Sequence, residues 1–258
     1  MKDKIKKIIL KKNKQKILCL TSYSKNIAEI LDRFVDIILV GDSLGSVLYN
    51  YNSTRKVLLR NMIEHSKSVR MGIRKSLMVV DMPFQTYRTK NEALSNAKKL
   101  MKITKCDAVK LEGGKKIINI VDYLIKNKIP VMGHIGILPQ SVKGKFRFKG
   151  KNKSDKKKLI SDAKLLEERG VFSIVLECIE SSTSMAISSK IPTIGIGSSS
   201  NCDGQVLVTD DMIGLNPNSF RFVKKYGNVK KYIESSVKKF RSDVLNKKFP
   251  TKKYSFVY

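Results

Sequence analysis

Acidic and polar side chains directly follow short apolar runs of the chain at several places, namely at Asp42, Ser43, Asp81, Glu112 and Glu177. Burying an ionised carboxylate costs free energy unless a cation or strong hydrogen-bond donors meet it. If the ends of these runs converge, a divalent cation would relieve the repulsion between the carboxylates. Oxygen ligands without clustered histidine or cysteine indicate Mg²⁺ rather than zinc. Asp42 and Asp81 are therefore the best candidate ligands, and Glu112 is expected to help directly or through a water.

The same residues also have structural explanations. Asp42 could be the N-cap of the next helix, Asp81 could start a turn, and Glu112 could simply pair with Lys110. Lys110 and Glu112, however, have the same side-chain parity on one strand, so both can point into one cavity, where a buried lysine needs an anion. His134 also follows an apolar run, where a histidine is more often a structural imidazole than a ligand. The coincidence of all these positions favours the functional interpretation.

The pattern of apolar residues predicts the elements that position these side chains. Short apolar runs alternate with longer helical stretches, which is typical of parallel strands buried on both faces. The eight runs are 16–20, 37–40, 77–80, 108–111, 130–133, 173–176, 193–196 and 205–208. Eight strands with intervening helices in about 250 residues match a (β/α)8 barrel, an α/β fold in which the carboxyl ends of the strands carry the chemistry. A doubly wound open sheet is the alternative.

Between most of these runs, apolar residues recur at the spacing of a helix. Ser154 is expected to cap a helix that ends at Arg169, and Thr54 is expected to begin another. Further helical stretches are 93–100, 117–127 and 229–244. The polar segment 141–154 follows the fifth strand, so on a barrel it belongs to a loop at the active face.

Length and composition fit one domain over residues 1–258 with a short basic N-terminal extension. The apolar runs are far shorter than the ~20 residues that cross a bilayer. The N-terminal segment has neither the apolar region nor the cleavage site of a signal peptide. We therefore expect a cytoplasmic protein that does not bind membranes. The four cysteines fit no zinc spacing and are expected to be reduced, buried thiols.

The formal charge of +30 raises the alternative of a protein that binds polyanions. The lysines are spread along the whole chain, however, and are not gathered with interleaved aromatic residues, as a base-stacking surface would require. This distribution favours a solvated basic surface and a protein that does not bind nucleic acid.

Nine ordered segments of the sequence resemble those of the ketopantoate hydroxymethyltransferase (3-methyl-2-oxobutanoate hydroxymethyltransferase) family, of the phosphoenolpyruvate/pyruvate barrel superfamily. They are LTSY, VGDSLG, DMPF, DAVKLEGG, PVMGHIG, PQSV, VLE, IPTIGIG and CDGQVLV, between residues 20 and 208. The similarity extends over roughly residues 16–256. GDS alone would be a weak signal, but nine blocks in order at matching strand ends are specific.

The resemblance implies transfer of a hydroxymethyl group from 5,10-methylenetetrahydrofolate to 3-methyl-2-oxobutanoate, which gives ketopantoate for pantothenate biosynthesis. By the pattern of the family, Asp42 and Asp81 hold Mg²⁺, with Glu112 completing or supporting the site. Asp42, Ser43, Asp81 and Lys110 would contact the oxoacid, and Glu177 would be the proton acceptor. The resemblance also implies a homo-oligomer, with a decamer as the expected size.

The residue types suit this chemistry. Mg²⁺ chelated by the keto and carboxylate oxygens would stabilise the enolate of the oxoacid, and Lys110 would add positive charge near the same anion. Fold and metal do not fix the reaction, so a carbon–carbon lyase or mutase that acts on another oxoacid remains an alternative. The sequence departs from the family at Ser198, Ser199 and Asp210. A serine after Gly197 would be strained if its own φ were positive.

Overall fold

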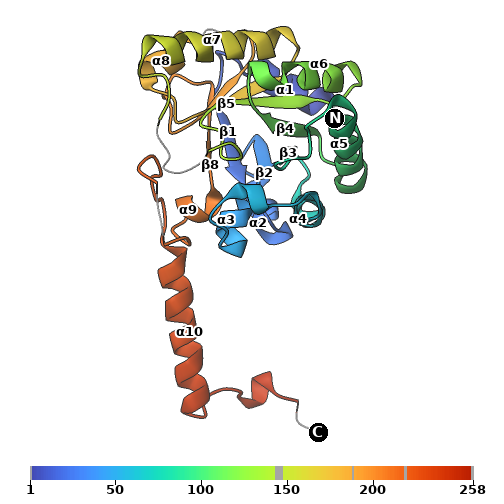
Figure 1. Cartoon of the computed structure of the whole chain (residues 1–258). Coiled ribbons are helices and arrows are strands. Elements are labelled where there is room, and N and C mark those ends of the chain that lie inside the picture. Colours follow the sequence, from blue (N-terminus) through green and yellow to red (C-terminus); the bar gives the residue numbers. More distant parts are fainter. Residues whose placement is uncertain (1, 143–147, 188, 218–219, 257–258) are drawn as a thin grey trace. The chain divides into compact units, whose positions relative to one another are not determined.

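Eight short parallel strands form a closed barrel in the order β1 to β8 (Figure 1). The computed structural model describes residues 2–142, 148–187, 189–217 and 220–256. The strands are β1 (Ile17–Thr21), β2 (Ile37–Val40), β3 (Leu77–Asp81), β4 (Ala108–Glu112), β5 (Val131–Gly136), β6 (Ser173–Glu177), β7 (Thr193–Ile196) and β8 (Gly204–Leu207). Each strand pairs with its successor, and β8 closes the ring on β1. The predicted barrel is confirmed, and the alternative of an open sheet is wrong.

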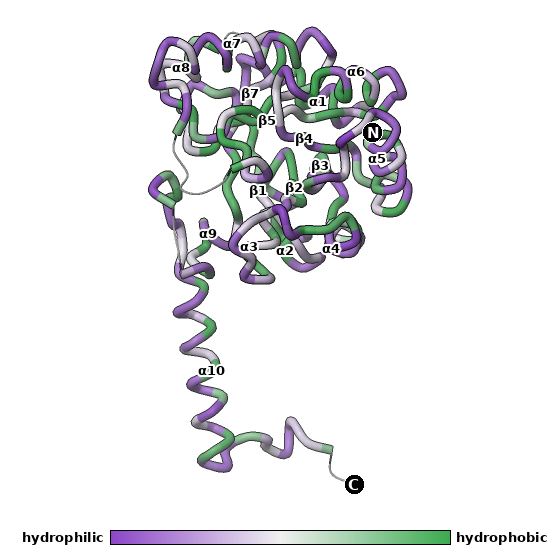
Figure 2. The backbone as a smooth tube through the Cα atoms, in the orientation of Figure 1, coloured by the Kyte–Doolittle hydropathy of each residue, from purple (hydrophilic) through white to green (hydrophobic). Residues whose placement is uncertain are grey.

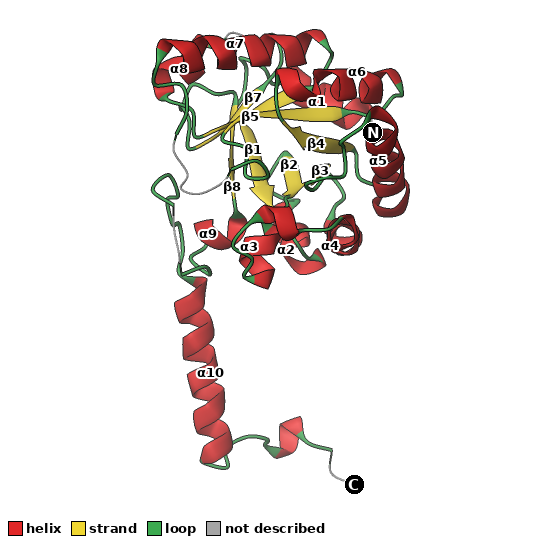
Figure 3. Cartoon of the chain, viewed as in Figure 1, coloured by secondary structure: helices red, strands yellow, loops and turns green. Residues whose placement is uncertain are grey.

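Helices follow most of the strands along the chain. They are α1 (Lys2–Leu10), α2 (Lys25–Leu31), α3 (Leu44–Tyr49), α4 (Leu59–Gly72), α5 (Lys90–Thr104), α6 (Ile118–Lys126), α7 (Lys153–Glu168), α8 (Ser181–Ala186), α9 (Thr209–Met212) and α10 (Val229–Leu245), with 3₁₀ turns η1 (Thr54–Lys56), η2 (Lys115–Ile117) and η3 (Lys252–Tyr254). The helices α2 to α8 surround the barrel (Figure 3). In the described part of the chain, no helix combines the length and the apolar character needed to cross a membrane.

The chain divides into two compact units. Residues Met1–Val208 form the first unit, which contains the whole barrel, and Thr209–Tyr258 form the second, with α9 and α10. Figure 2 shows hydrophobic residues along the barrel strands, whereas hydrophobic and hydrophilic positions alternate along α10. The expectation of a single domain over residues 1–258 stays a prediction.

Alternation along the strands decides which side chains enter the barrel. On β2, Ile37 and Leu39 belong to the apolar cluster inside the barrel, whereas Ile38 and Val40 pack with the surrounding helices. The same period of two holds on β4, where Ala108 lies inside. Side chains two and four residues further along each strand therefore also point inward, at the carboxyl end of the barrel. This periodicity is the reason why polar residues at the strand ends share one space.

The basic N-terminal segment folds as the helix α1, which packs against the barrel within the first unit. Ile8 on α1 is 3% exposed and joins the cluster inside the barrel, while Ile5 packs against the same cluster. Lys11 pairs with Asp36 at 2.5 Å, and Lys12 pairs with Asp203 at 2.7 Å. Both lysines lie next to the amino ends of strands, away from the carboxyl ends. Helix α1 therefore closes the amino end of the barrel and contributes to its core.

We expect the substitution Ile8→Ala to lower the free energy of unfolding by roughly 2–4 kcal/mol, because it removes buried apolar groups and leaves a cavity. The matched control is Ile9→Ala on the same helix, where the side chain is 38% exposed and the cost is expected to be below about 1 kcal/mol. Urea denaturation of both variants measures the difference. Equal costs for the two would show that α1 does not pack as described.

Two predicted helix starts are wrong. Helix α7 is capped by Asn152, whose Oδ1 accepts a hydrogen bond from the Asp155 amide at 2.8 Å, so that Ser154 already lies inside the helix. Thr54 begins the short turn η1 and not a long helix, because the chain returns to an extended conformation at Leu58 before α4. The predicted end of α7 at Arg169 is confirmed.

The other sequence-based elements agree with the structure. The stretches 93–100, 117–127 and 229–244 correspond to α5, α6 and α10, and no helix lies between β7 and β8 in this described stretch. All four cysteines are free thiols; Cys178 is half-buried and the other three are buried. The loop predicted over residues 141–154 includes residues 143–147, which lie outside the described part.

Candidate active site

The register of the strands brings five predicted or noted residues together at the carboxyl end of the barrel. Asp81 on β3 lies opposite Lys110 on β4, and Glu112 on β4 lies opposite His134 on β5. Asp42 follows β2 directly after Gly41. These five side chains belong to residues that are only 2–5% exposed, and we call them the polar cluster. The structure therefore gathers residues that are up to 92 positions apart in the sequence, since 134 − 42 = 92.

Asp81 and Lys110 form a buried ion pair within the polar cluster. Lys110 Nζ lies 3.2 Å from Asp81 Oδ1, and the Asp42 amide donates a hydrogen bond to Asp81 Oδ2 at 3.1 Å. The anion expected for the buried lysine is thus present. Asp81 Oδ1 is buried without a hydrogen bond from the described residues, so the ammonium group is its close polar neighbour.

Asp42 does not cap the helix that follows it. Helix α3 begins at Leu44 with Ser43 at the N-cap position, and no side chain caps its first turn. The Asp42 carboxylate instead accepts a hydrogen bond from Gln140 at 2.8 Å. Ser43 Oγ lies 2.8 Å from the Tyr23 hydroxyl, which places a second polar group next to Asp42. The capping explanation is therefore wrong.

Gln140 is a site residue that the sequence analysis missed. It is 2% exposed, and its backbone amide donates to Glu112 Oε2 at 3.0 Å. Its side-chain Nε2 donates to Asp42 Oδ2 and to the Met82 carbonyl at 3.0 Å, and its Oε1 accepts from the Tyr87 hydroxyl at 2.5 Å. Every polar atom of the amide is thus used. The motif PQSV contains this glutamine, but a loop residue after a strand has no periodic pattern that would reveal a contact with Asp42.

The electrostatics of the polar cluster favour binding of a cation. Burial, together with the charge of Asp81, raises the pKa of Asp42 to about 7, and burial with the charge of Asp42 raises the pKa of Glu112 well above its usual value. Although burial opposes the charge of Lys110, Asp81 and Glu112 hold its pKa above the usual value, so it stays protonated. The buried ammonium group of Lys110 faces the carboxylates of Asp42, Asp81 and Glu112. The raised pKa values of Asp42 and Glu112 mean that these two groups bind protons more readily than usual, and a bound cation would displace those protons.

His134 connects the lysine to the predicted base. Lys110 Nζ lies 3.1 Å from His134 Nδ1, and His134 Nε2 lies 3.2 Å from Glu177 Oε2. Burial and the nearby Lys110 charge lower the pKa of His134, which keeps the imidazole neutral. Because an ammonium group can only donate, Nδ1 accepts and the ring proton lies on Nε2, on the side of Glu177. The second contact does not meet hydrogen-bond geometry, as is common for catalytic groups without substrate.

Glu177 differs from the other acidic residues of the site in its exposure. Its side chain is 16% exposed, compared with 4% for Asp81 and 2% for Glu112. It lies at the end of β6 with the inward parity of Val175. A carboxylate that is accessible and adjacent to the polar cluster can exchange a proton with a bound small molecule.

The residues present fit a magnesium ion held by two carboxylates. Mg²⁺ is usually bound through one or two carboxylates and keeps several waters or substrate oxygens as its other ligands. Asp42 and Asp81 supply such a pair, and the buried Oδ1 of Asp81 has no hydrogen bond from the described residues, with Lys110 Nζ 3.2 Å away. Glu112 Oε2 is occupied by the Gln140 amide, which suits a supporting role. In the part of the chain that is described, no three acidic, histidine or cysteine side chains form a ready-made metal cage.

The departure at Ser198 causes no backbone strain. The positive φ of this turn, 59°, falls on Gly197. Ser198 Oγ donates to the Leu176 carbonyl at 2.8 Å and accepts from the Ile179 amide at 3.1 Å. These two hydrogen bonds link Ser198 to the end of β6 and to the residues that follow it, next to Glu177. Asp210 lies in α9, within the second unit.

We expect Gln140→Ala to weaken Mg²⁺ binding and turnover by about 10- to 100-fold, because it frees the carboxylate of Asp42 and the hydroxyl of Tyr87 inside a buried space. The control is Gln15→Ala, the same change at an exposed residue, which should leave both quantities unchanged. Calorimetric titration with Mg²⁺ in the presence of the oxoacid provides the measurement. Unaltered Mg²⁺ affinity in Gln140→Ala would contradict its role in positioning Asp42.

Comparison with known proteins identifies relatives along the whole chain. The family model described as ketopantoate hydroxymethyltransferase matches residues 2–252. A 3-methyl-2-oxobutanoate hydroxymethyltransferase of Pelagibacter ubique (strain HTCC1062) is 64% identical over 258 residues, which cover 99% of this chain and 100% of the relative. The enzyme of the same name from Bartonella tribocorum (strain CIP 105476 / IBS 506) is 43% identical over 248 residues, 94% of this chain and 92% of its own.

Solved structures with low sequence identity share the fold. A phosphonopyruvate hydrolase in complex with oxalate and Mg²⁺ matches with a TM-score of 0.63 at 8% identity, over 97% of this chain and 93% of its own. A 2,3-dimethylmalate lyase of the PEP mutase/isocitrate lyase superfamily matches with a TM-score of 0.64 at 10% identity, over 93% of this chain and 86% of its own. At 8% and 10% identity these similarities show the fold alone. The family model and the curated relatives, the latter at much higher identity, match nearly the whole sequence, and the chain belongs to the ketopantoate hydroxymethyltransferase family.

Proposed function

We propose that this chain transfers a hydroxymethyl group from 5,10-methylenetetrahydrofolate to 3-methyl-2-oxobutanoate and thereby forms 2-dehydropantoate (ketopantoate). The observation that carries this proposal is the buried polar cluster, which combines carboxylates suited to Mg²⁺ with a charged lysine, beside an accessible carboxylate at Glu177. Membership of the family supports the choice of substrates.

The first task of the site is to bind and polarise the oxoacid. In this proposal Asp42 and Asp81 hold Mg²⁺, with Glu112 in support. The bound ion supplies Lewis-acid polarisation of the keto group, which makes the neighbouring carbon–hydrogen bond more acidic. Ser43 donates a hydrogen bond to the oxoacid, and Lys110 places its charge beside the oxygen on which negative charge develops.

The second task is to move a proton and form the new bond. Glu177 accepts the proton from C3 of the oxoacid, and His134 Nε2 lies 3.2 Å from its carboxylate. The resulting carbon nucleophile forms a bond to the methylene carbon of the folate donor as one of the two carbon–nitrogen bonds of that carbon breaks. Water then replaces the second carbon–nitrogen bond, so that the donor leaves as tetrahydrofolate and the transferred carbon carries a hydroxyl group.

Two assays test the proposal. Purified protein with 3-methyl-2-oxobutanoate in D₂O should exchange the C3 hydrogen only when Mg²⁺ is present. Addition of 5,10-methylenetetrahydrofolate should then yield ketopantoate. Deuterium exchange without formation of ketopantoate would favour a lyase or mutase of the same fold. If exchange and ketopantoate formation both continue after Mg²⁺ is removed, the metal assignment is refuted.

We also propose a homo-oligomer. Helix α10 supports this proposal, because it exposes an apolar face at helical spacing in which Ile233 is 46%, Val237 57% and Phe240 57% exposed. Sedimentation velocity should give a species far larger than the 29.2 kDa chain, with a decamer as the expected size. A monomer at micromolar concentration would contradict this proposal.

The cytoplasmic location remains a prediction.

A further inference from the structure

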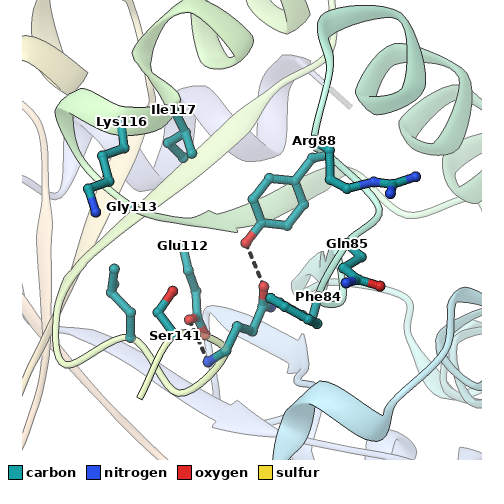
Figure 4. A pocket seen from close by; sticks show the side chains of 11 residues that line it. Phe84, Gln85, Arg88, Glu112, Gly113, Lys116, Ile117 and Ser141 are labelled. Atoms are coloured by element: carbon teal, nitrogen blue, oxygen red, sulfur yellow. Dashed lines mark hydrogen bonds between the residues drawn. The ribbon is translucent and has the colours of Figure 1, made fainter. Parts of the chain in front are cut away.

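A cavity of about 310 Å³ lies at the carboxyl end of the barrel, beside the polar cluster (Figure 4). Its volume is within the range of about 300–1,000 Å³ that is usual for small-molecule sites. Three segments form its walls: the loop after β3, the end of β4 with η2, and the loop after β5. The residues from these segments include Phe84, Tyr87, Arg88, Glu112, Lys116, Ile117 and Gln140.

The cavity and the polar cluster share side chains. Glu112 belongs to both, and Gln140 lines the cavity while its amide group donates to Asp42 at 2.8 Å. The Tyr87 hydroxyl, from the opposite wall, donates to the same glutamine. A molecule in the cavity therefore lies one side chain away from Asp42 and its neighbours. A second substrate held there would lie next to the space in which the oxoacid is proposed to bind, and a reaction between two bound molecules requires such neighbouring sites.

The walls combine flat or apolar surface with positive charge at the rim. Phe84, Tyr87 and Ile117 supply aromatic and aliphatic surface, as Figure 4 shows for the labelled Phe84 and Ile117. Arg88 and Lys116 are exposed. Arg88 pairs with Glu92 at 3.1 Å, whereas Lys116 forms no ion pair with any residue in the described ranges. The cavity thus suits a planar heteroaromatic group that carries an acidic tail.

We propose that this cavity binds the folate one-carbon donor, with the ring system inside and the glutamate tail directed to the rim at Lys116 and Arg88. This inference rests on the proposed function and adds the location of the second substrate. The occupant is a folate rather than an oxoacid because Phe84, Tyr87 and Ile117 give the cavity aromatic and aliphatic walls. The cations of its lining, Arg88 and Lys116, are exposed side chains. Methylenetetrahydrofolates with several glutamates should bind more tightly than the monoglutamate.

The experiment compares the Michaelis constant for the donor with the rate of deuterium exchange into 3-methyl-2-oxobutanoate, which needs no donor. Ile117→Trp fills the cavity and should raise the Michaelis constant for the donor by more than about tenfold while exchange continues. Lys116→Glu, at an exposed side chain, should raise it about fivefold or more for a pentaglutamate donor and much less for the monoglutamate. Lys99→Glu, on the exposed part of α5, is the charge-matched control and should change neither quantity.

The outcomes separate the inference from the function on which it rests. Continued exchange together with a weaker donor interaction in both variants would establish the cavity as the donor site. If both variants keep the wild-type Michaelis constant while the enzyme forms ketopantoate, the donor binds elsewhere and only this inference is overturned. If wild-type protein exchanges deuterium but forms no ketopantoate with any donor, the proposed function fails, and the inference fails with it.

Discussion

Asp81→Ala should abolish Mg²⁺-dependent formation of ketopantoate, with a loss of about a thousandfold or more in turnover, while the barrel stays folded. The Asp81 carboxylate lies 3.2 Å from Lys110 Nζ and accepts a hydrogen bond from the Asp42 amide at 3.1 Å. Its removal takes away the proposed metal ligand and the counter-charge of the lysine. Loss of the ligand weakens the metal site, and an uncompensated ammonium repels a divalent cation that should bind beside it. Calorimetric titration with Mg²⁺ and a product assay measure the two effects.

Further variants distinguish loss of the site from loss of the fold. Asp81→Asn keeps the shape and an acceptor for the Asp42 amide but removes the charge, so its activity should fall nearly as far with a smaller loss of stability. Asp122→Asn changes a half-buried carboxylate on α6 that pairs with Lys126 at 2.8 Å, outside the polar cluster, and it should behave as the wild type. Retention of tight Mg²⁺ binding and normal turnover in Asp81→Ala would refute the ligand assignment, whatever the melting temperature.

The second large effect is expected for Glu177→Gln, which should still bind 3-methyl-2-oxobutanoate but should lose deuterium exchange at C3 by roughly 10²–10⁴-fold. The glutamine amide has the size of the carboxylate, so it can keep the contact with His134, whose Nε2 lies 3.2 Å from Glu177 Oε2 in the wild type. The amide cannot accept the proton from C3 of the oxoacid. Binding of the oxoacid depends on the polar cluster and should change by less than a few fold. Exchange monitored by NMR and oxoacid binding monitored by calorimetry give the two numbers.

The control for this substitution is Glu168→Gln on the exposed surface of α7, which removes only an ion pair of 4.0 Å with Lys164. Its exchange rate should equal that of the wild type. Rapid exchange in Glu177→Gln would exclude this residue as the base and would direct attention to another acceptor near the oxoacid. Loss of oxoacid binding in that variant would instead assign Glu177 to the binding of the substrate.

The two predictions separate two steps that one assay of ketopantoate would merge. Asp81→Ala should remove both Mg²⁺ affinity and exchange, because polarisation of the keto group precedes proton transfer. Glu177→Gln should remove exchange and leave Mg²⁺ affinity unchanged, since its carboxylate lies outside the pair that we propose to hold the ion. A shared loss of Mg²⁺ affinity would mean that Glu177 belongs to the metal site.

The sequence determined much of the fold because the barrel depends on local patterns. Strand β2 begins and ends where the apolar run Ile37–Val40 does, and β7 coincides with the run from Thr193 to Ile196. These two strands are buried on both faces and contain almost only apolar residues, so the apolar run in the sequence marks where each strand begins and ends. The inward parity of Lys110 and Glu112 followed from the same period of two. Helix starts were less certain, as Ser154 and Asn152 offer similar caps within two residues and only backbone geometry chose between them.

The convergence of the carboxylates also followed from the sequence, because acidic residues at the ends of parallel strands meet at one end of a barrel. The magnesium ion that they would hold stays a proposal. What only the tertiary structure decided was which distant groups meet these carboxylates. Gln140 joins Asp42, Glu112 and Tyr87 through a loop without periodicity, and His134 lies between Lys110 and Glu177 through the register of neighbouring strands. Helix α1 was read as a basic extension, yet Ile8 enters the barrel core. The local sequence pattern specifies on which face of a strand a side chain lies. The residues that it contacts depend on closure of the barrel, because closure brings together segments that are far apart in the sequence.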